Sequence, residues 1–409
     1  MQNRENKKIL FIMGGLVHYY NPILEALDGL PGYSLASLTP DIGSSSLGKG
    51  VYTENGNLKF ETFFLPEKKG LFGKPFFKGF IPLLKNYGPD IIIAGWPYSL
   101  EILLNPFIPK KGIQVIHKDI PFNLSNYDDA LQDYRTGKII VSENYDHSNA
   151  KNPLKTLSYW LVTQLRKRFL SKASALVCYT TDALKIFPSY GVNKESIFII
   201  YNSPDTKKLL AASDSAKDLP NKLAPNPFRM IHVGRLVKWK KVDLVLQAMA
   251  KLKPNFPDIE FLVVGNGPEK DTWEQLASDL GLAGQVNFLG AIYDPIDLAK
   301  YHQESAFYIL GGIGGLSINE AMCFGKAVIC SEADGTEKML VRDGKNGLFF
   351  KSDDVHDLAD KIQLLLESAE KCFDYGKESE RIIKEEINET KVVEGYKNAF
   401  DYLTKLETA

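Results

Sequence analysis

The sequence predicts an α/β protein built from two successive doubly wound domains. Short, nearly continuous apolar runs alternate with helical segments, which is typical of parallel strands covered by helices on both faces. This alternation weakens between Asp205 and Pro227, where Lys, Asp, Ser, Ala, Asn and Pro dominate, and then restarts. A chain of 409 residues is long enough for two such domains. The expected parts are an N-terminal domain at 1–205, a linker at 206–226, a C-terminal domain at 227–389 and a final helix at 390–409.

In the first half, strands and helices are expected in regular alternation. The strands are short apolar runs, and the helices carry apolar residues at helical spacing. The expected strands are Lys8–Met13, Ile91–Ala94, Gln114–His117, Lys138–Val141, Ala175–Cys178 and Ile197–Tyr201. The expected helices are Asn21–Leu30, Tyr98–Leu104, Asn152–Leu170 and Asp182–Pro188.

The second half repeats the alternation of short apolar strands and helices. The expected strands are Phe228–Val233, Ile259–Val264, Val286–Leu289, Ala306–Leu310, Ala327–Cys330 and Gly347–Phe350. The expected helices are Lys241–Leu252, Glu269–Leu280, Pro295–Gln303, Ser317–Phe324, Val355–Glu367 and Lys377–Ile387. Ligands of such sheets bind beyond the carboxyl ends of the strands, so the expected site is a cleft between the two domains.

Composition excludes several classes of protein. The 49 Lys and Arg residues nearly balance 50 Asp and Glu residues, which argues against a dedicated nucleic-acid binder. The 4 cysteines form no Cys-x-x-Cys pair and no zinc spacing, so we expect reduced thiols. No apolar run approaches the ~18–20 residues of a spanning helix, and Ile9–Gly14 is too short for a signal-peptide core. We therefore expect a cytoplasmic protein.

Several motifs for cofactor and metal chemistry are absent from the sequence. Neither the turn at Gly14-Gly15 nor that at Gly265–Gly267 has the Gly-x-Gly-x-x-Gly spacing of a dinucleotide site. The sequence also lacks a P-loop, His-Glu-x-x-His, Gly-x-Ser-x-Gly and Asp-x-Asp. Metal-dependent phosphate chemistry therefore has no visible anchor.

The strongest chemical signal is a basic pair that follows a strand and precedes a helix. Arg235 and Lys240 are five residues apart in HVGRLVKWKK, with Gly234 before the arginine. A guanidinium and an ammonium at a strand's carboxyl end are suited to bind one anion. A solvated basic loop is the alternative.

A glycine-rich loop is the second signal. Gly311, Gly312, Gly314 and Gly315 follow a strand and lead into a helix that is expected to begin at Leu316–Ser317. Such glycines let backbone amides approach a ligand, and a helix N-terminus favours a phosphate. Glu320 falls in the first turn, where it could accept hydrogen bonds from sugar hydroxyls. Alternatively, Ser317-x-x-Glu320 is a capping box.

Together these segments resemble the retaining GT-B glycosyltransferases of family 4, the glycosyl transferases group 1. The resemblance covers most of the chain and is strongest from Arg235 to Glu337. The matching segments are FIIYNSPDTKKL, HVGRLVKWKKVDLVLQA, FLVVGNGPEKDTWEQLA, VNFLGAI, GGLSINEAMCFGKAVICS and GLFF. It implies a GT-B fold, in which two Rossmann-like domains face each other across a cleft. It also implies that the segment Thr390 to Leu406, which has an apolar face, crosses back to the N-terminal domain.

The resemblance implies roles for individual residues. Arg235 and Lys240 match the pair that binds the donor pyrophosphate, and Glu320 matches the glutamate that contacts the nucleotide ribose. His117 stands where the family has its active-site histidine; a hydrogen-bonded structural histidine is the alternative. The remaining donor-binding residues are expected to be Gly15, Gly314, Gly315, Leu316 and Ser317.

One position departs from the family pattern. Eight residues before Glu320 stands Gly312, where many members carry a glutamate that touches hydroxyls of the donor sugar. The sugar therefore differs, or another group replaces that side chain.

The implied function is transfer of a sugar from a UDP- or GDP-linked donor to a hydroxyl acceptor, without metal or other cofactor and with retention of configuration. The products would be surface polysaccharides or glycolipids, such as lipopolysaccharide or capsule. One alternative is a nucleotide-sugar epimerase of the same fold, which needs further acid/base carboxylates. Another is a non-catalytic sugar-nucleotide-binding protein. A third alternative is a dinucleotide-dependent oxidoreductase, and the absence of a Gly-x-Gly-x-x-Gly motif argues against it.

Two basic regions predict contact with the inner face of the plasma membrane. Residues 68–85 interleave lysines with aromatic residues, and the helix around Tyr159–Lys172 adds Arg166, Lys167 and Arg168. Basic residues beside apolar ones bind anionic membrane surfaces. A solvated loop and a core-packed helix are the alternative interpretation.

Overall fold

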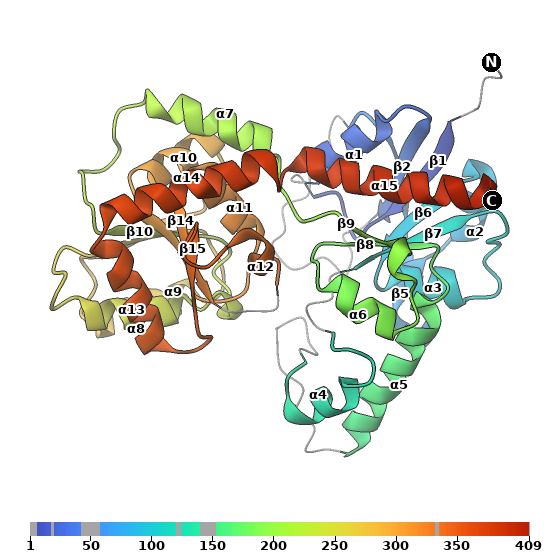
Figure 1. The fold of residues 1–409 in the computed structure, drawn as a ribbon, viewed down its shortest axis with the longest axis horizontal. Helices are drawn as coiled ribbons and strands as arrows, with labels where there is room; N and C mark the ends of the chain where they lie inside the picture. Colours follow the sequence, from blue (N-terminus) through green and yellow to red (C-terminus); the bar gives the residue numbers. More distant parts are fainter. Residues whose placement is uncertain are drawn as a thin grey trace. The chain divides into compact units, whose positions relative to one another are not determined.

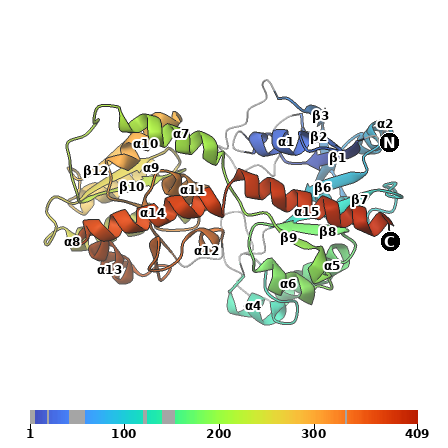
Figure 2. The same ribbon diagram turned by 45° about the horizontal axis from the view of Figure 1, so that its top comes forward.

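The computed structural model describes residues 6–17, 20–41, 58–119, 124–139, 153–331 and 335–408. It divides into two compact units (Figures 1 and 2). Of the described residues, those up to 139 together with 153–201 and 390–408 form the first unit, and those from 202 to 389 form the second. The prediction of an α/β protein with two doubly wound sheets is confirmed.

The first unit is built on a seven-stranded parallel sheet with the order β3-β2-β1-β6-β7-β8-β9. Its strands are β1 (Lys7–Ile12), β2 (Tyr33–Pro40), β3 (Glu61–Leu65), β6 (Ile91–Gly95), β7 (Gln114–Asp119), β8 (Ala175–Cys178) and β9 (Ile197–Ile199). β4 (Glu67–Lys69) and β5 (Pro75–Phe77) form a separate antiparallel pair. The helices are α1 (Asn21–Asp28), α2 (Phe80–Tyr87), α3 (Tyr98–Leu104), α4 (Ala130–Thr136), α5 (Pro153–Leu170), α6 (Ala183–Ser189) and α15 (Glu389–Thr408).

The C-terminal helix α15 packs on the sheet of the first unit, as predicted. Its Tyr396 hydroxyl lies 2.7 Å from the Tyr20 hydroxyl. A side chain at Gly395 would meet the Ile199 carbonyl, so the helix passes close to the end of β9. The helix buries one apolar face, made by Val392, Tyr396, Ala399, Phe400 and Leu403. Leu406, expected on that face, is instead exposed.

Several elements of the first unit differ from the predictions. β2, β3, α2 and α4 were not predicted. The two strands were missed because they mix Ser, Thr and Glu with apolar residues and so give no continuous apolar run. Ser37 and Thr62 bond to each other across these two strands. The strand predicted at 138–141 lies partly outside the described residues, and positions 138 and 139 are not strand.

The second unit is built on a six-stranded parallel sheet with the order β12-β11-β10-β13-β14-β15. All of its strands were predicted: β10 (Arg229–Val233), β11 (Glu260–Val264), β12 (Val286–Gly290), β13 (Phe307–Leu310), β14 (Ala327–Ser331) and β15 (Gly347–Phe350). The helices are α7 (Thr206–Lys217), α8 (Val242–Leu252), α9 (Lys270–Asp279), α10 (Pro295–Gln303), α11 (Leu316–Cys323), α12 (Glu337–Leu340), α13 (Val355–Leu366) and α14 (Ala369–Glu385).

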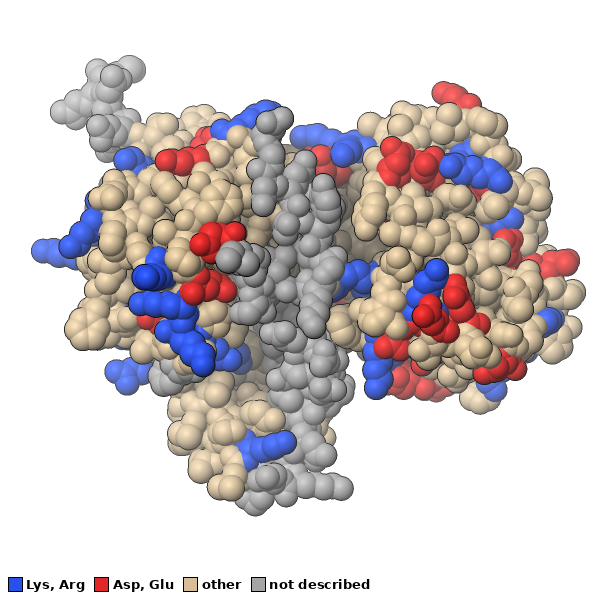
Figure 3. Space-filling view, turned by 180° about the vertical axis from the view of Figure 1, so that it is seen from behind, with Lys and Arg blue, Asp and Glu red and all other residues tan. Residues whose placement is uncertain are grey.

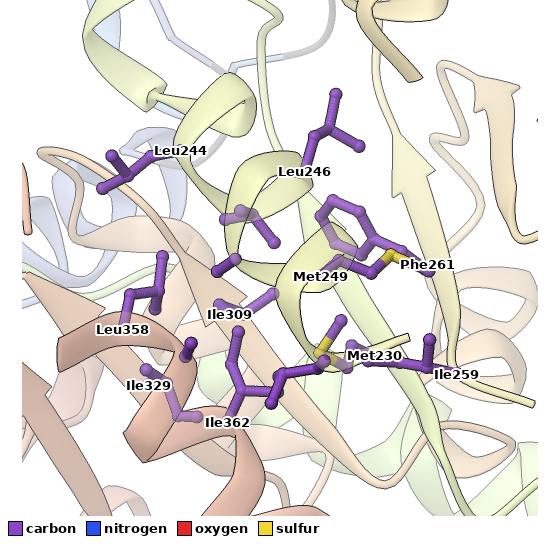
Figure 4. Close-up of a cluster of buried hydrophobic side chains, with 14 of the residues drawn as sticks. Met230, Leu244, Leu246, Met249, Ile259, Phe261, Ile309, Ile329, Leu358 and Ile362 are labelled. Atoms are coloured by element: carbon purple, nitrogen blue, oxygen red, sulfur yellow. The ribbon is translucent and has the colours of Figure 1, made fainter. Parts of the chain in front are cut away.

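The core of the second unit lies between its sheet and the helices α8 and α13. Met249 from α8 and Ile362 from α13 pack against Met230, Ile309 and Ile329 of the strands (Figure 4). All five side chains are fully buried. Continuous burial of this kind is why these strands appear in the sequence as unbroken apolar runs.

The segment predicted as a linker begins with helix α7. Asp205 caps it by accepting a hydrogen bond from the Lys208 N–H at 3.0 Å. Leu209, Ala212 and Ala216, spaced three and four residues apart, are buried. The helix therefore belongs to the second unit, and its small apolar residues were too sparse to reveal it beside the many polar ones.

Two further features bear on the predicted environment. Cys178, Cys323, Cys330 and Cys372 are free and buried. Among the described residues, no helix combines the length and the apolar character needed to cross a membrane.

Candidate functional site

The basic motif of the second unit follows β10 in a loop that packs against the loop after β11. The Gly234 N–H donates to the Val264 carbonyl at 3.0 Å, and the Leu236 N–H donates to the Asn266 carbonyl at 2.9 Å. A side chain at Gly265 would overlap the Gly234 carbonyl. Glycine is therefore required for the two loops to meet, and their contact fixes the backbone on both sides of Arg235.

The glycine loop after β13 packs directly on the backbone of the basic motif. A Cβ at Gly311 would overlap the Lys241 carbonyl, and one at Gly312 would overlap the Trp239 carbonyl. The Ile313 N–H donates to that same Trp239 carbonyl at 3.1 Å. The two strongest signals of the sequence thus form one structure at the carboxyl ends of β10 and β13.

Lys240 joins these two loops through its side chain. Its Nζ donates a hydrogen bond to the Ile313 carbonyl at 2.9 Å. Burial, and to a lesser extent the nearby Arg235 charge, lower the pKa of Lys240 to about 8, and the Glu337 charge opposes this shift. The Arg235 guanidinium lies 5.9 Å from the centre of the Trp239 ring. Two cationic groups are therefore held together, and a bound anion would stabilise both.

Helix α11 begins at Leu316, directly after the glycine loop. Gly315 occupies the N-cap position, where a Cβ would overlap the Thr336 hydroxyl. The first N–H groups of a helix have no partner within the helix, and they carry the positive end of its dipole. Gly314, two residues before the helix, lies beside Lys240, because a side chain at Gly314 would meet the Lys240 Nζ.

The capping-box interpretation of Ser317 and Glu320 is wrong. Ser317 lies inside the helix, not at its N-cap, and its Oγ accepts a hydrogen bond from the Tyr308 hydroxyl at 2.8 Å. Glu320 is half-buried, and burial raises its pKa to about 8. Its carboxyl group is therefore protonated at neutral pH and is able both to donate and to accept a hydrogen bond.

Glu337 is a candidate site residue that the sequence reasoning missed. It is fully buried at the start of α12, where one carboxylate oxygen accepts from the Gly335 N–H at 3.0 Å. Its Oε2 has no hydrogen-bond partner among the described residues. Burial raises the pKa of Glu337 to about 7, although backbone hydrogen bonds and the Lys240 charge oppose this shift. The only sequence signal was its position after Gly335-Thr336, beyond a buried strand.

In the first unit, Gly15 and His117 lie at the carboxyl ends of β1 and β7. Gly15 is a buried bend residue after β1. The His117 side chain is fully buried, with Nε2 3.2 Å from Asp119 Oδ2 and the ring edge-on to Phe169. This pairing makes Nε2 the protonated nitrogen and leaves Nδ1, which has no partner among the described residues, as an acceptor.

Lys118, next to His117, is a second residue that the sequence reasoning missed. Its Nζ lies 4.1 Å from the ring centre of Tyr20, 5.0 Å from that of Tyr179 and 5.6 Å from that of Phe11. Burial lowers its pKa to about 7. A lysine directly after the apolar run IQVIH was the available signal.

The described residues contain no group of three or more His, Cys, Asp or Glu side chains arranged to hold a metal ion.

Comparison with known proteins supports the sequence resemblance. Residues 214–382 match the family model of glycosyl transferases group 1. An uncharacterized glycosyltransferase of Methanocaldococcus jannaschii is 29% identical over 253 residues, which are 60% of this chain and 63% of that protein. The phosphatidyl-myo-inositol mannosyltransferase of Mycolicibacterium smegmatis is 34% identical over 158 residues, 37% of this chain and 40% of the relative. The matches thus cover less than two thirds of these relatives.

Solved structures resemble nearly the whole chain. The crystal structure of HepE from Anabaena in complex with UDP has a TM-score of 0.64 at 17% identity and covers 97% of this chain and 99% of that one. A sucrose-phosphate synthase from Thermosynechococcus elongatus has a TM-score of 0.66 at 19% identity and covers 98% and 100%. The chain therefore has the GT-B fold of these proteins, and the match of residues 214–382 to the model of glycosyl transferases group 1 lies in the region where the sequence motifs resemble that family.

Proposed function

We propose that this protein is a metal-independent, retaining glycosyltransferase of family 4 that uses a nucleotide-diphosphate sugar. The observation that carries the proposal is the junction of the two loops, where the Lys240 Nζ bonds to the Ile313 carbonyl at 2.9 Å beside Arg235. Two cations, a glycine-rich backbone and the N-terminus of α11 meet there. This combination suits a diphosphate better than any other common ligand.

In the proposed reaction, Arg235 and Lys240 stabilise the charge that develops on the leaving diphosphate. The bond between the anomeric carbon and the diphosphate oxygen breaks through an oxocarbenium-like transition state. The acceptor oxygen then bonds to the same face of that carbon, and its proton passes to the departing diphosphate. Positive groups already in place need no reorganisation during this step, which is why such preorganisation accelerates it.

The donor is proposed to be UDP- or GDP-linked. The solved HepE structure contains UDP, which supports a uridine nucleotide. Gly315, Leu316 and Ser317 would contact the phosphates through their backbone, and Glu320 would bond to ribose hydroxyls. The Trp239 backbone fills the space that a side chain at position 312 would need. The donor sugar would therefore be contacted without the glutamate that many family members carry at this position.

His117 and Gly15 complete the proposal from the first unit. His117 would act on the transferred sugar through the nitrogen that does not face Asp119, and Gly15 would let the backbone approach the donor. The buried position of the ring leaves the structural role of His117 as the competing interpretation.

A nucleotide-sugar epimerase is the second candidate, and the structure contains one observation in its favour. Glu337 is a buried carboxyl group with a pKa near 7 and an oxygen without a partner among the described residues, as an acid/base group requires. Incubation of a labelled nucleotide sugar without acceptor separates the two: an epimerase returns an isomeric sugar, whereas a transferase gives none.

The experiment that tests the main proposal is a thermal-shift screen of nucleotides and nucleotide sugars, followed by transfer assays with the donor that stabilises most. A ligand that binds only the native state raises the stability by RT ln(1 + [L]/Kd). Transfer is expected to continue in EDTA. Loss of transfer with EDTA that Mg²⁺ or Mn²⁺ restores would contradict metal independence.

The acceptor is proposed to be a carbohydrate or a lipid-linked sugar, used at the inner face of the plasma membrane. For the membrane contact proposed through residues 68–85, three of the aromatic residues, Phe76, Phe77 and Phe80, are buried in the core and do not contribute. The exposed residues of this segment include Lys68, Lys69, Lys74, Lys78 and Lys85. Figure 3 shows a group of Lys and Arg side chains with Asp and Glu side chains beside it on one face of the first unit. Because these phenylalanines are buried, the proposed contact of this segment is carried by its exposed lysines.

A further inference from the structure

His232 is a fully buried histidine in β10, the strand that leads into the basic motif. Its Nδ1 lies 3.1 Å from the Ile309 carbonyl oxygen. Because a carbonyl oxygen can only accept, Nδ1 carries the proton and Nε2 keeps a lone pair. Nε2 has no hydrogen-bond partner among the described residues. The second unit therefore holds a buried nitrogen that is able to accept a hydrogen bond.

This nitrogen and the side chain of Lys240 border the same point. A Cβ built on Gly234 would lie 3.4 Å from His232 Nε2 and 3.9 Å from Lys240 Cε. Because position 234 is a glycine, no side chain separates the two. The Lys240 ammonium donates one hydrogen bond to the Ile313 carbonyl and has further N–H groups for other acceptors. A donor thus lies beside an acceptor that lacks one.

The imidazole of His232 is neutral at the pH values at which Lys240 titrates. Burial, and to a lesser extent the Lys240 charge, lower the pKa of His232 to about 4, and its backbone hydrogen bond opposes this shift. The other titratable groups around the two side chains are Arg235 in the same loop, Tyr308 on β13 and Glu337 on α12. Burial raises the pKa of Tyr308 well above its usual range, so that hydroxyl is also neutral. The lone pair of Nε2 is therefore available to a cation.

A need for packing alone does not explain a histidine at this position. The neighbouring residues of β10, Met230, Ile231 and Val233, are apolar. A buried acceptor without a donor destabilises the folded state, whereas an apolar ring of similar size would fill the same volume without that cost. Unsatisfied buried groups of this kind call for an explanation in function.

His302 provides a comparison with a histidine that lies away from the basic motif. Both imidazole rings are fully buried and stack on Tyr308, His232 at 6.2 Å and His302 at 6.1 Å between ring centres. The charge that acts on the pKa of His302 is that of Lys326, whereas for His232 it is that of Lys240. The two residues thus share their burial and stacking partner and differ in the lysine that they face.

We propose that His232 is a positioning residue for Lys240: when a diphosphate binds, His232 Nε2 accepts a hydrogen bond from the Lys240 ammonium. The remaining N–H groups of that ammonium are then directed to the Ile313 carbonyl and to the phosphate oxygens. This inference rests on the proposed function of Lys240. A hydrogen bond accepted from the charged amine favours the protonated form, so His232 also keeps Lys240 charged to a higher pH.

Nuclear magnetic resonance of the unaltered chain tests this bond directly. The chain has 6 histidines, so its ¹⁵N-imidazole resonances can be assigned with the variants His232→Gln and His302→Phe. Saturation with UDP or GDP should move the resonance of the unprotonated Nε2 of His232 upfield, because this nitrogen becomes a hydrogen-bond acceptor. The resonances of His302 should stay constant, and Lys240→Met should remove the shift. A His232 resonance that stays constant in the saturated complex would overturn the inference.

The pH dependence of nucleotide affinity tests the effect on Lys240. His232→Phe keeps the volume and the stacking but has no acceptor, His232→Gln restores an acceptor, and His302→Phe is the matched control. The Kd of UDP or GDP should begin to rise about one pH unit lower in His232→Phe, because the pKa of Lys240 falls when the accepted bond is lost. Near pH 8, where Lys240 titrates, this shift corresponds to about fivefold weaker binding. His232→Gln and His302→Phe should titrate as the unaltered chain does. Isothermal titration calorimetry at several pH values gives these constants.

A purely structural role of His232 predicts a different result. Both phenylalanine variants would then change the free energy of unfolding in urea, and neither would move the pH dependence of the Kd. That result would overturn the inference, as would equal shifts in His232→Phe and His302→Phe. If His232→Phe does not fold, the resonance measurement on the unaltered chain decides. Failure of the unaltered chain to bind either nucleotide would refute the proposed function and this inference with it, whereas binding without a role for His232 refutes the inference alone.

Discussion

The candidate functional residues of the two units differ in how well they can be predicted from the sequence. In the second unit, the diphosphate candidates sit in loops that need glycine for backbone contact, such as Gly265 and Gly312. Loops of this kind have a fixed spacing and leave a motif. In the first unit, His117 and Lys118 lie at the end of a strand with ordinary neighbours. The glycine loops thus leave a motif of their own in the sequence, whereas His117 was predicted only from the family resemblance and Lys118 was missed.

The largest expected effect is the loss of kcat when either cation of the second unit, Arg235 or Lys240, is removed. Arg235→Ala and Lys240→Ala should each lower kcat by about 10²–10³-fold, because each removes a preorganised charge that acts on the leaving diphosphate. Steady-state transfer assays measure the loss, and circular dichroism checks the fold. Lys238→Ala is the control, since Lys238 is an exposed lysine in the same loop. Near-normal turnover of the folded Arg235 and Lys240 variants would show that other groups neutralise the diphosphate.

A second prediction concerns the position that departs from the family pattern. Gly312→Glu should destabilise the protein by about 1–3 kcal/mol or more, because the new side chain overlaps the Trp239 carbonyl and separates the two loops. Denaturant unfolding measures this change. Gly284→Ala is a matched control, since a Cβ there meets nothing within 4 Å. If Gly312→Glu unfolds like the unaltered chain, the loops are not held together by that backbone contact.

The third prediction is that, above pH 8, loss of the Lys240 proton lowers activity and raises the free energy of unfolding. The pKa of Lys240 is lowered to about 8, so kcat/KM for the donor should fall about tenfold per pH unit above that value as the charge is lost. Between pH 8 and 10.5 the unfolded chain holds this proton and the folded chain does not. The contribution of Lys240 to the free energy of unfolding therefore rises with pH in that window.

Lys240→Met tests the origin of both slopes. It should lower the slope of the free energy of unfolding against pH between pH 8 and 10.5 by the contribution of one proton, because Lys118 and Lys326, whose pKa values are also lowered by burial, keep their own contributions. The remaining activity should lose its fall above pH 8. Urea unfolding and donor titrations at several pH values measure the two quantities. Unchanged slopes in the variant would assign them to another group.

The smallest expected effect lies in the first unit. His117→Gln should leave the Kd of the nucleotide changed by less than about twofold, because nucleotide binding is assigned to the second unit, while transfer decreases. Isothermal titration with the nucleotide alone gives this affinity. A large loss of affinity would break the division of roles between the units.

Most of the fold was predictable because burial on both faces leaves continuous apolar runs, as in the FLVV of β11 and the FYIL of β13 in the second unit. β2 and β3 were missed because their Ser37 and Thr62 interrupt such a run and bond to each other. α7 was missed because its buried positions are small residues within a polar segment. Prediction from the local sequence pattern therefore fails for strands whose polar side chains bond to a neighbouring strand. It also fails for a helix whose buried residues are small and stand among polar ones.

By itself the sequence determined the two parallel sheets, the basic pair at Arg235 and Lys240 and the glycine loop, because each depends on local spacing and on residue types with fixed conformational properties. Only the tertiary structure decided that Lys240 bonds to the Ile313 carbonyl and that Gly312 leaves room for the Trp239 backbone. It also decided that the His232 ring bonds to the Ile309 carbonyl. These features depend on which distant segments meet, and the pKa values of Glu320 and Glu337 depend on the burial that follows from those contacts.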